Sequence, residues 1–177
     1  MNDAEFLLLR QTIATRGTVR MALVPLTMLG WAALVLALIL FSNLPIAALL
    51  PLAVLAGGFE AIHALHAGVE RVGRYLQVFY EEQANGAQWE TTAVQAGPPL
   101  PGGGVDPLFS ALFLSAVAVN LVPALLPSPT PVELGAVGAV HAAFAVRIVR
   151  ARLAAGRQRA VEHERFRQLL LREGNRQ

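Results

Sequence analysis

The stretch Met21–Phe41, MALVPLTMLGWAALVLALILF, contains 21 consecutive residues without a charged side chain. At a rise of about 1.5 Å per residue, a helix of this length crosses roughly 30 Å, the thickness of the hydrocarbon core of a bilayer. In hydrocarbon every backbone N–H and C=O needs a partner inside the protein, and a helix supplies these partners within one segment. The stretch therefore predicts a membrane-spanning helix in an all-α protein.

Three more apolar segments follow in the 177-residue chain, of which 55% is apolar. They run from Leu44 to Gly68, with the first arginine after them at Arg71, from Pro107 to Leu126 and from Val132 to Val146. The turns SNLP and PSPTP, which join the first pair and the second pair, are short and uncharged. The sequence therefore predicts a polytopic membrane protein with four transmembrane helices in two antiparallel hairpins. Pro131 and Glu133 suit the first turn of the last helix.

Arginines near the ends of the spans indicate the orientation. Arg16 and Arg20 precede the first span, Arg71 and Arg74 follow the second, and further arginines follow the fourth. The positive-inside rule then places both termini and the middle loop in the cytoplasm. All 14 basic side chains are arginine, and Ala, Gly and Pro are abundant. This composition is typical of a GC-rich bacterial genome, so we expect a bacterial inner-membrane protein.

Outside the bilayer we expect the second and fourth spans to continue as cytoplasmic helical extensions. Glu70 and Arg74 have the i,i+4 spacing of an ion pair on such a helix.

A weak alignment of the two hairpins at their histidines leaves an internal duplication open. The expected parts are an N-terminal cytoplasmic or interfacial segment (1–20), a first transmembrane hairpin (21–71), a cytoplasmic helix with a Pro/Gly-rich loop (72–105), a second hairpin (106–147) and a basic cytoplasmic C-terminal helix (148–177).

The basic character of the chain is concentrated in its tail. Residues 147–176 hold nine Arg and three Glu, although the net charge of the whole chain is +2. Because this tail leaves a membrane helix, we expect it to meet anionic lipid headgroups or a partner protein. The residues expected to do so are Arg147, Arg150, Arg152, Arg157 and Arg159. No recognition motif for nucleic acid accompanies them, so nucleic acid is not an expected partner.

The chain contains neither cysteine nor lysine. Disulfides, thiolate nucleophiles, cysteine-ligated metals, Schiff bases and the P-loop lysine are therefore excluded. We find no catalytic motif in the sequence, so an enzyme is the less favoured class.

Four polar side chains inside the spans are the candidate site. Glu60 lies eleven residues before Arg71, which by helical rise puts it roughly 16 Å from the cytoplasmic boundary. A carboxylate at such depth is expensive and marks a candidate site by default. His63 follows one turn later, and Asn120 and His141 belong to the third and fourth spans. Together they predict a buried polar cluster that holds the helices to one another.

Two alternatives start from the same residues. His63 and His141 lie at similar distances from the arginines that end their spans, so their heights should agree within roughly 3 Å. Facing imidazoles at one depth would suit the axial ligation of haem b in an electron-transfer protein. Alternatively, Glu60 and the histidines could line a proton or ion path in an oligomeric channel or transporter. If the polar cluster only holds the helices to one another, which is the reading we favour, no cofactor is expected.

The function we expect is that of a small integral membrane protein acting as an interaction or accessory subunit. It would be a scaffold in a membrane complex or a homo-oligomer, contacting the bilayer, copies of itself or other membrane subunits. The apolar run Leu169–Leu171 and Phe166 lie in the cytoplasmic tail and need to be covered. His163, flanked by Glu162 and Glu164, is expected on a solvated helix face.

Overall fold

The computed structural model of the chain describes residues 3–82, 91–92 and 107–174. In these ranges all regular structure is helical, and four helices are long and apolar enough to cross a membrane. The predicted all-α fold with four candidate spans is therefore confirmed.

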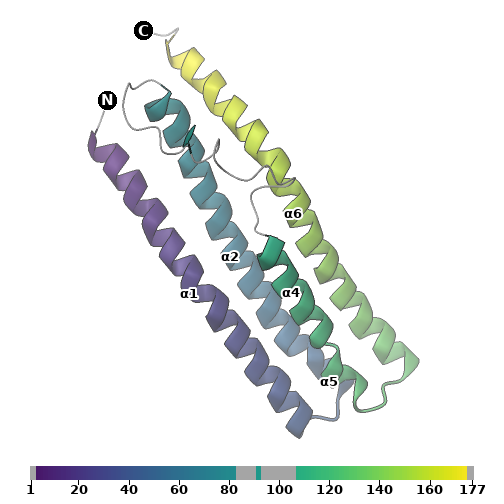
Figure 1. Cartoon of the computed structure of the whole chain (residues 1–177). Helices are drawn as coiled ribbons and strands as arrows, with labels where there is room; N and C mark the ends of the chain where they lie inside the picture. The colour runs from purple at the N-terminus through teal and green to yellow at the C-terminus, as the bar shows by residue number, and fades with distance from the viewer. Residues whose placement is uncertain (1–2, 83–90, 93–106, 175–177) are drawn as a thin grey trace. The chain divides into compact units, whose positions relative to one another are not determined.

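Several helices extend well beyond the apolar segments (Figure 1). The elements are α1 (Asp3–Phe41), the 3₁₀ turn η1 (Pro45–Ala48), α2 (Leu49–Leu76), the π-helical turn η2 (Gln77–Glu81), α4 (Pro107–Val119), α5 (Val122–Leu125) and α6 (Pro131–Gly174). Thus α1 begins before the apolar stretch at Met21, and α6 continues past the end of the fourth apolar segment at Val146.

The start of α6 follows from its first residues. The Thr130 N–H and the Thr130 hydroxyl both donate to Glu133 Oε2, at 2.9 and 2.8 Å, and the Glu133 N–H lies 3.3 Å from Thr130 Oγ1. This reciprocal arrangement is a capping box, and Pro131 needs no N–H partner at the first helical position. The expected role of Pro131 and Glu133 in starting the helix is confirmed.

The third apolar segment is interrupted between α4 and α5. α4 ends at Val119, Asn120 and Leu121 form a turn, and α5 starts with Pro123 in its first turn. A proline at this place lacks the N–H that would continue the hydrogen-bond ladder of α4. Asn120 therefore lies at a break in the helix rather than in its middle.

The chain divides into two compact units. Unit 1 comprises Met1–Arg20, Ala64–Gly104 and Leu153–Gln177, and unit 2 comprises Met21–His63 and Val105–Arg152. Unit 2 contains most of the apolar sequence, and unit 1 contains the more highly charged parts of the chain.

The core of unit 2 is built around Phe59 of α2. The centroid of its ring lies 5.4 Å from that of Phe113 and 5.6 Å from that of Phe109, both of α4, and 5.8 Å from that of Phe144 of α6. The buried positions of α2 recur at helical spacing, so one face of the helix packs inward. They are Leu52, Leu55, Phe59 and Ile62.

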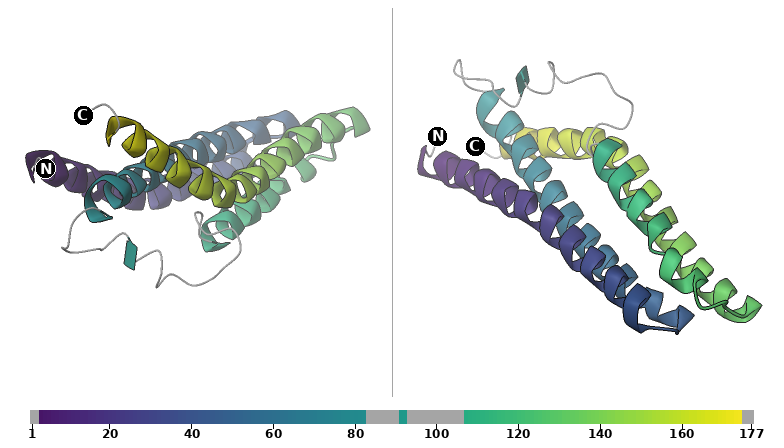
Figure 2. Two further views of the ribbon diagram at one scale, coloured as in Figure 1. Left: turned by 90° about the horizontal axis from the view of Figure 1, so that it is seen from above. Right: turned by 60° about the horizontal axis from the view of Figure 1, so that its bottom comes forward.

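In unit 2, α1 and α2 lie side by side and run in opposite directions (Figures 1 and 2). The buried side chain of Thr27 fills the space that a Cβ at Gly58 would need. One turn further along α1, a Cβ at Gly30 would meet Val54 at 3.8 Å, which is ordinary contact. The missing Cβ of Gly58 is therefore what lets the two helices approach at this height.

Aromatic rings hold unit 1 together. Tyr75 of α2 stacks on Phe79 at 4.6 Å, and Phe166 of α6 packs edge-on against both, at 5.8 and 6.4 Å. Phe6 of α1 lies 5.5 Å from Tyr80. In the described part of unit 1, α1, the segment from α2 to η2, and α6 thus share one aromatic cluster.

Candidate functional site

Asn120 and His141 form a fully buried hydrogen-bonded pair in unit 2. Asn120 is 0% exposed and His141 is 2% exposed. Asn120 Nδ2 donates to the Ala48 carbonyl at 2.8 Å and lies 2.9 Å from His141 Nε2, and its Oδ1 accepts from Trp31 Nε1 at 3.0 Å. The two predicted residues are therefore brought together, with Trp31 and Ala48 as partners that the sequence did not reveal.

The hydrogen bonds of His141 determine which of its nitrogens carries the proton. His141 Nδ1 lies 2.8 Å from the Val137 carbonyl. A carbonyl can only accept, so Nδ1 must be the protonated nitrogen and Nε2 must accept from Asn120. His141 is thus a neutral imidazole with both nitrogens occupied. The network connects α1, η1, the α4–α5 turn and α6, which makes it a polar clamp across unit 2.

Glu60 does not belong to this clamp. Its Oε2 accepts a hydrogen bond from Arg147 Nη2 at 2.7 Å, and the two side chains are 48% and 44% exposed. The Arg147 guanidinium also lies 5.9 Å from the centroid of the Phe59 ring. Arg147, which was expected to meet lipid headgroups or a partner, is the counter-ion of Glu60 in this structure.

The neighbours of Glu60 show that it lies at the edge of the apolar part of unit 2. Arg147 is the first arginine of α6, and Phe109, whose ring packs on Phe59, is the third residue of α4. The level of Glu60 is therefore the level at which α4 begins and α6 gains its first charge. Arg71, from which the depth of Glu60 was counted, lies further along the same helix and belongs to unit 1.

His63 lies apart from both groups. Its ring stacks on Phe59 with centroids 5.8 Å apart and an interplanar angle of 5°. Its Nδ1 is among the buried polar atoms without a hydrogen-bond partner in the described part of the chain. The expected polar cluster of four residues is thus divided into the Asn120–His141 pair, the Glu60–Arg147 pair and His63.

Contrary to the prediction from the sequence, the two histidines do not lie at the same height in unit 2. α2 and α6 run in the same direction (Figure 1), and Glu60 contacts Arg147. His63 follows Glu60 by three residues while His141 precedes Arg147 by six, so their heights differ by roughly 13 Å rather than agreeing. Both nitrogens of His141 have hydrogen-bond partners in this arrangement.

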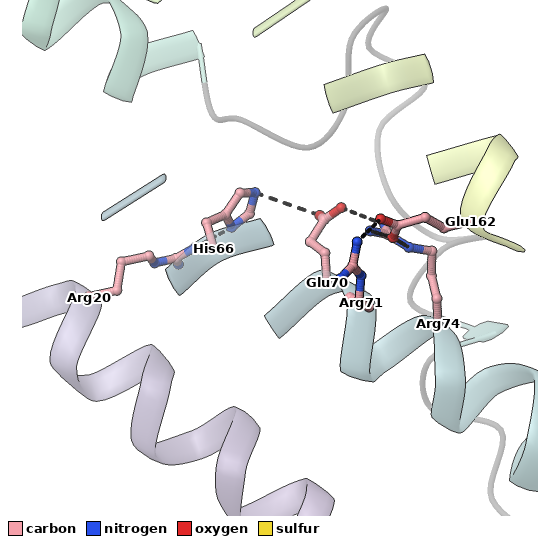
Figure 3. Close-up of polar contacts among 6 residues, drawn as sticks. All are labelled: Arg20, His66, Glu70, Arg71, Arg74 and Glu162. Atoms are coloured by element: carbon pink, nitrogen blue, oxygen red, sulfur yellow. Dashed lines mark hydrogen bonds and ion pairs between the residues drawn. The ribbon is translucent and has the colours of Figure 1, made fainter. Parts of the chain in front are cut away.

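A second polar group, in unit 1, joins three helices (Figure 3). Arg74 of α2 is 8% exposed; its Nε donates to Glu162 Oε2 of α6 at 2.9 Å, and its Nη1 donates to Glu70 Oε2 at 2.8 Å. Arg71 Nη2 adds a bond of 3.1 Å to Glu162 Oε1. The i,i+4 pair of Glu70 and Arg74 expected from the sequence is confirmed.

The same group reaches α1 through a histidine. His66 Nε2 lies 3.7 Å from Glu70 Oε1, and Arg20 Nη1 of α1 lies 2.6 Å from His66 Nδ1. A guanidinium has only donors, so Nδ1 of His66 is the acceptor in this contact. We call the six side chains of Figure 3 the charged network: Arg20, His66, Glu70, Arg71, Arg74 and Glu162.

Glu162 is the residue of this network that sequence analysis misjudged, since it was expected on a solvated face. Burial raises the pKa of Glu162, but the hydrogen bonds and charges of Arg74 and Arg71 outweigh this effect and hold the pKa below its ordinary value of 4.5. Glu162 is therefore an ionised counter-charge for two arginines. Residues 147–176 hold only three acids among nine arginines, and this imbalance could have indicated that Glu162 pairs with arginine.

The remaining tail arginines differ in their surroundings. Arg150 and Arg157 are exposed and Arg152 is half-buried, while the side chain of Arg159 lies outside the described part of the structure. Arg150 and Arg157 are therefore accessible to headgroups or to a partner.

Comparison of the chain with protein-family models, with curated proteins and with solved structures found no match.

Proposed function

We propose that the protein is a multi-pass scaffold or accessory subunit of a bacterial inner membrane, with unit 2 in the bilayer and unit 1 in the cytoplasm as a helical stalk. The opposite directions of α1 and α2 support a first hairpin, and the charge-free turns at Asn43 and Ser128 support an outer location for both turns. The arginines of unit 1 support a cytoplasmic location for both termini.

The observation that carries this proposal is apolar surface on the stalk that the described part of the chain leaves uncovered. Leu169 and Leu171 of α6 are 48% and 65% exposed, and Leu7 and Leu8 near the start of α1 are also exposed. Phe166, by contrast, packs on the rings of Tyr75 and Phe79 and needs no partner. Exposed leucines outside the apolar spans are typical of a protein-binding surface.

The surroundings of these leucines indicate the chemistry of the partner. Arg165, Arg167 and Arg172 lie on the same stretch of α6 as Leu169 and Leu171 and are exposed. An amphipathic helix with acidic flanks would cover the leucines and match the arginines. The charged network and the aromatic cluster hold the stalk helices together, so such a partner would meet a preformed surface.

The test uses the full-length chain with Leu169→Gln and Leu171→Gln combined. Proteins that co-purify from the native membrane would be compared by quantitative mass spectrometry between this variant and the original protein. We expect specific partners to fall by about tenfold or more, the scale for losing two buried apolar contacts. Gln168→Ala, a change at a neighbouring exposed position, is the control and should retain them. Unchanged recovery in the double variant would refute the proposal.

The two alternative functions receive less support from the described residues. A haem between His63 and His141 would need a different register of α2 and α6, and a visible absorbance spectrum of the oxidised and reduced protein tests it directly. An ion path through Glu60 would have to include its counter-ion Arg147. Flux that depends on Glu60 would favour that alternative.

A further inference from the structure

The Glu60–Arg147 pair lies on an exposed face of unit 2. Both side chains remain about half exposed although they contact each other at 2.7 Å. Both lie at the border of the apolar part of the unit, where a surface pair has lipid or protein as its next neighbour. Each member of a half-exposed pair can still form further hydrogen bonds. A neighbour that carries both a positive and a negative group would therefore stabilise the pair further.

The residues around the pair are unusually small. Ala53 and Gly57 share the face of Glu60 on α2 by helical spacing, and both are exposed. No atom lies within 4 Å of a Cβ placed at Gly57.

The matching face of α6 has similar residues. Ala136 and Ala143 precede Arg147 on one face of α6 by helical spacing, with the larger Val140 between them, and all three are exposed. We call this combined surface of α2 and α6 the small-residue face.

The outer surface of α1 is different. Most of its exposed side chains within the apolar stretch are large, among them Leu26, Leu29 and Leu36, and they outnumber the small exposed residues such as Gly30 and Ala33. Large aliphatic side chains suit contact with lipid, whereas small ones allow the backbones of two helices to approach closely. The outer surface of α1 is therefore suited to contact with lipid, and the small-residue face of α2 and α6 is suited to contact with another pair of helices.

We propose that the small-residue face binds the same face of a second copy of the chain, around a two-fold axis parallel to the helices. A two-fold interface brings one patch against its own copy, so the patch must be self-complementary. Glu60 and Arg147 are in contact and hence at one height along parallel helices. Rotation about that axis sets Glu60 beside Arg147 of the second copy and Arg147 beside Glu60 of the second copy.

The alternative occupant is an anionic lipid headgroup. A headgroup would attract Arg147 but would meet the negative charge of Glu60 directly beside it. A second copy satisfies both signs at once, which is why the charges favour self-association. The inference relies on the proposed membrane location of unit 2, but it does not rely on the partner surface of the stalk.

The first test is oxidative cross-linking in phospholipid vesicles. The chain has no cysteine, so Gly57→Cys introduces a single thiol, at a position with room for its Cβ. Leu29→Cys is the matched control, because Leu29 lies on the outer surface of α1 near the heights of Gly58 and Val54. We expect about tenfold more disulfide-linked dimer for the Gly57 variant than for the control. Equal yields would overturn the proposal.

The second test exchanges the charges between copies. Glu60→Arg in one differently tagged full-length copy and Arg147→Glu in another place like charges against each other in homodimers and opposite charges in mixed dimers. We expect co-purification of like copies to fall by about tenfold and that of mixed copies to recover. Failure of mixing to restore association would refute the charge pairing, and the cysteine test covers the case in which a charge variant does not fold.

Two further outcomes distinguish self-association from lipid binding and from partner binding by the stalk. Monomeric Gly57→Cys protein together with anionic lipid that is lost on Arg147→Gln would assign the face to headgroups and overturn self-association. Normal cross-linking in the Leu169→Gln, Leu171→Gln variant is expected whether or not the stalk surface binds a partner. Failure of the proposed stalk function is thus distinguishable from failure of this inference.

Discussion

At the scale of single residues, the contact between α1 and α2 depends on an atom that Gly58 lacks. A Cβ at Gly58 would overlap the buried side chain of Thr27. We expect Gly58→Ala to destabilise the protein by about 1–3 kcal/mol, the usual effect of overpacking. Thermal unfolding in detergent, followed by helical circular dichroism, measures this change.

The adjacent Gly57 is the control for this prediction. It has no atom within 4 Å of a Cβ, so Gly57→Ala should leave the unfolding temperature unchanged or raise it through helix propensity. An equal loss in both variants would mean that packing against Thr27 is not the cause.

Glu162 predicts how the stability of unit 1 depends on pH. Its pKa in the folded protein lies below the ordinary 4.5, despite the raising effect of burial, because Arg74 and Arg71 stabilise its charge. The stabilisation is therefore complete above pH 4.5 and is lost as the pH falls through the lower folded pKa. We expect Glu162→Gln to lose about 1–3 kcal/mol at neutral pH and to approach the original protein in acid.

Unfolding temperatures measured across that pH range check the prediction for Glu162. Glu164→Gln alters an exposed acid on the same turn of α6 and is the control, with little change expected. A constant difference between Glu162→Gln and the original protein at all pH values would contradict the assigned role.

Local spacing explains which of these residue pairs could be predicted. The Glu70–Arg74 pair is four residues apart and follows from helix geometry alone. The pairs Glu60–Arg147 and Arg74–Glu162 join residues 87 and 88 apart in sequence. Their partners depend on how buried apolar faces set the register between α2 and α6, which charge patterns do not specify.

At the scale of elements, the polar clamp around Asn120 joins four segments of unit 2. Asn120→Leu would leave Trp31 Nε1, the Ala48 carbonyl and His141 Nε2 without this partner. We expect a loss of about 1–2 kcal/mol, the scale of interhelical hydrogen bonds in membranes. Resistance to unfolding in a series of detergent mixtures measures it.

Asn43→Leu provides the comparison, because Asn43 is an exposed asparagine in the turn after α1. Its replacement should have little effect on stability. Equal resistance of the Asn120 and Asn43 variants would show that the clamp contributes nothing.

Hydropathy predicted the four spans but not the ends of their helices. α1 begins at Asp3 and α6 ends at Gly174, far outside the uncharged stretches. Charge marks where an apolar segment stops, whereas a helix stops only where its hydrogen bonds or backbone angles fail. The break at Asn120 could have been anticipated from Pro123, which follows it closely.

At the scale of the whole molecule, the proposed orientation predicts which positions are reachable from each side. Asn43 lies in the turn after α1, and Gln158 is an exposed residue of α6. In the cysteine-free chain, a membrane-impermeant thiol reagent should label Asn43→Cys in intact cells and Gln158→Cys only after permeabilisation. The reverse pattern would contradict the positive-inside assignment.

The hydrogen bond between Trp31 and Asn120 gives the protein an intrinsic optical probe. The chain contains two tryptophans, Trp31 and Trp89. With Trp89→Phe, all indole emission would come from Trp31, whose N–H lies 3.0 Å from Asn120 Oδ1. The wavelength of that emission would then report, without any attached dye, whether α1 is seated against the α4–α5 turn during insertion and refolding.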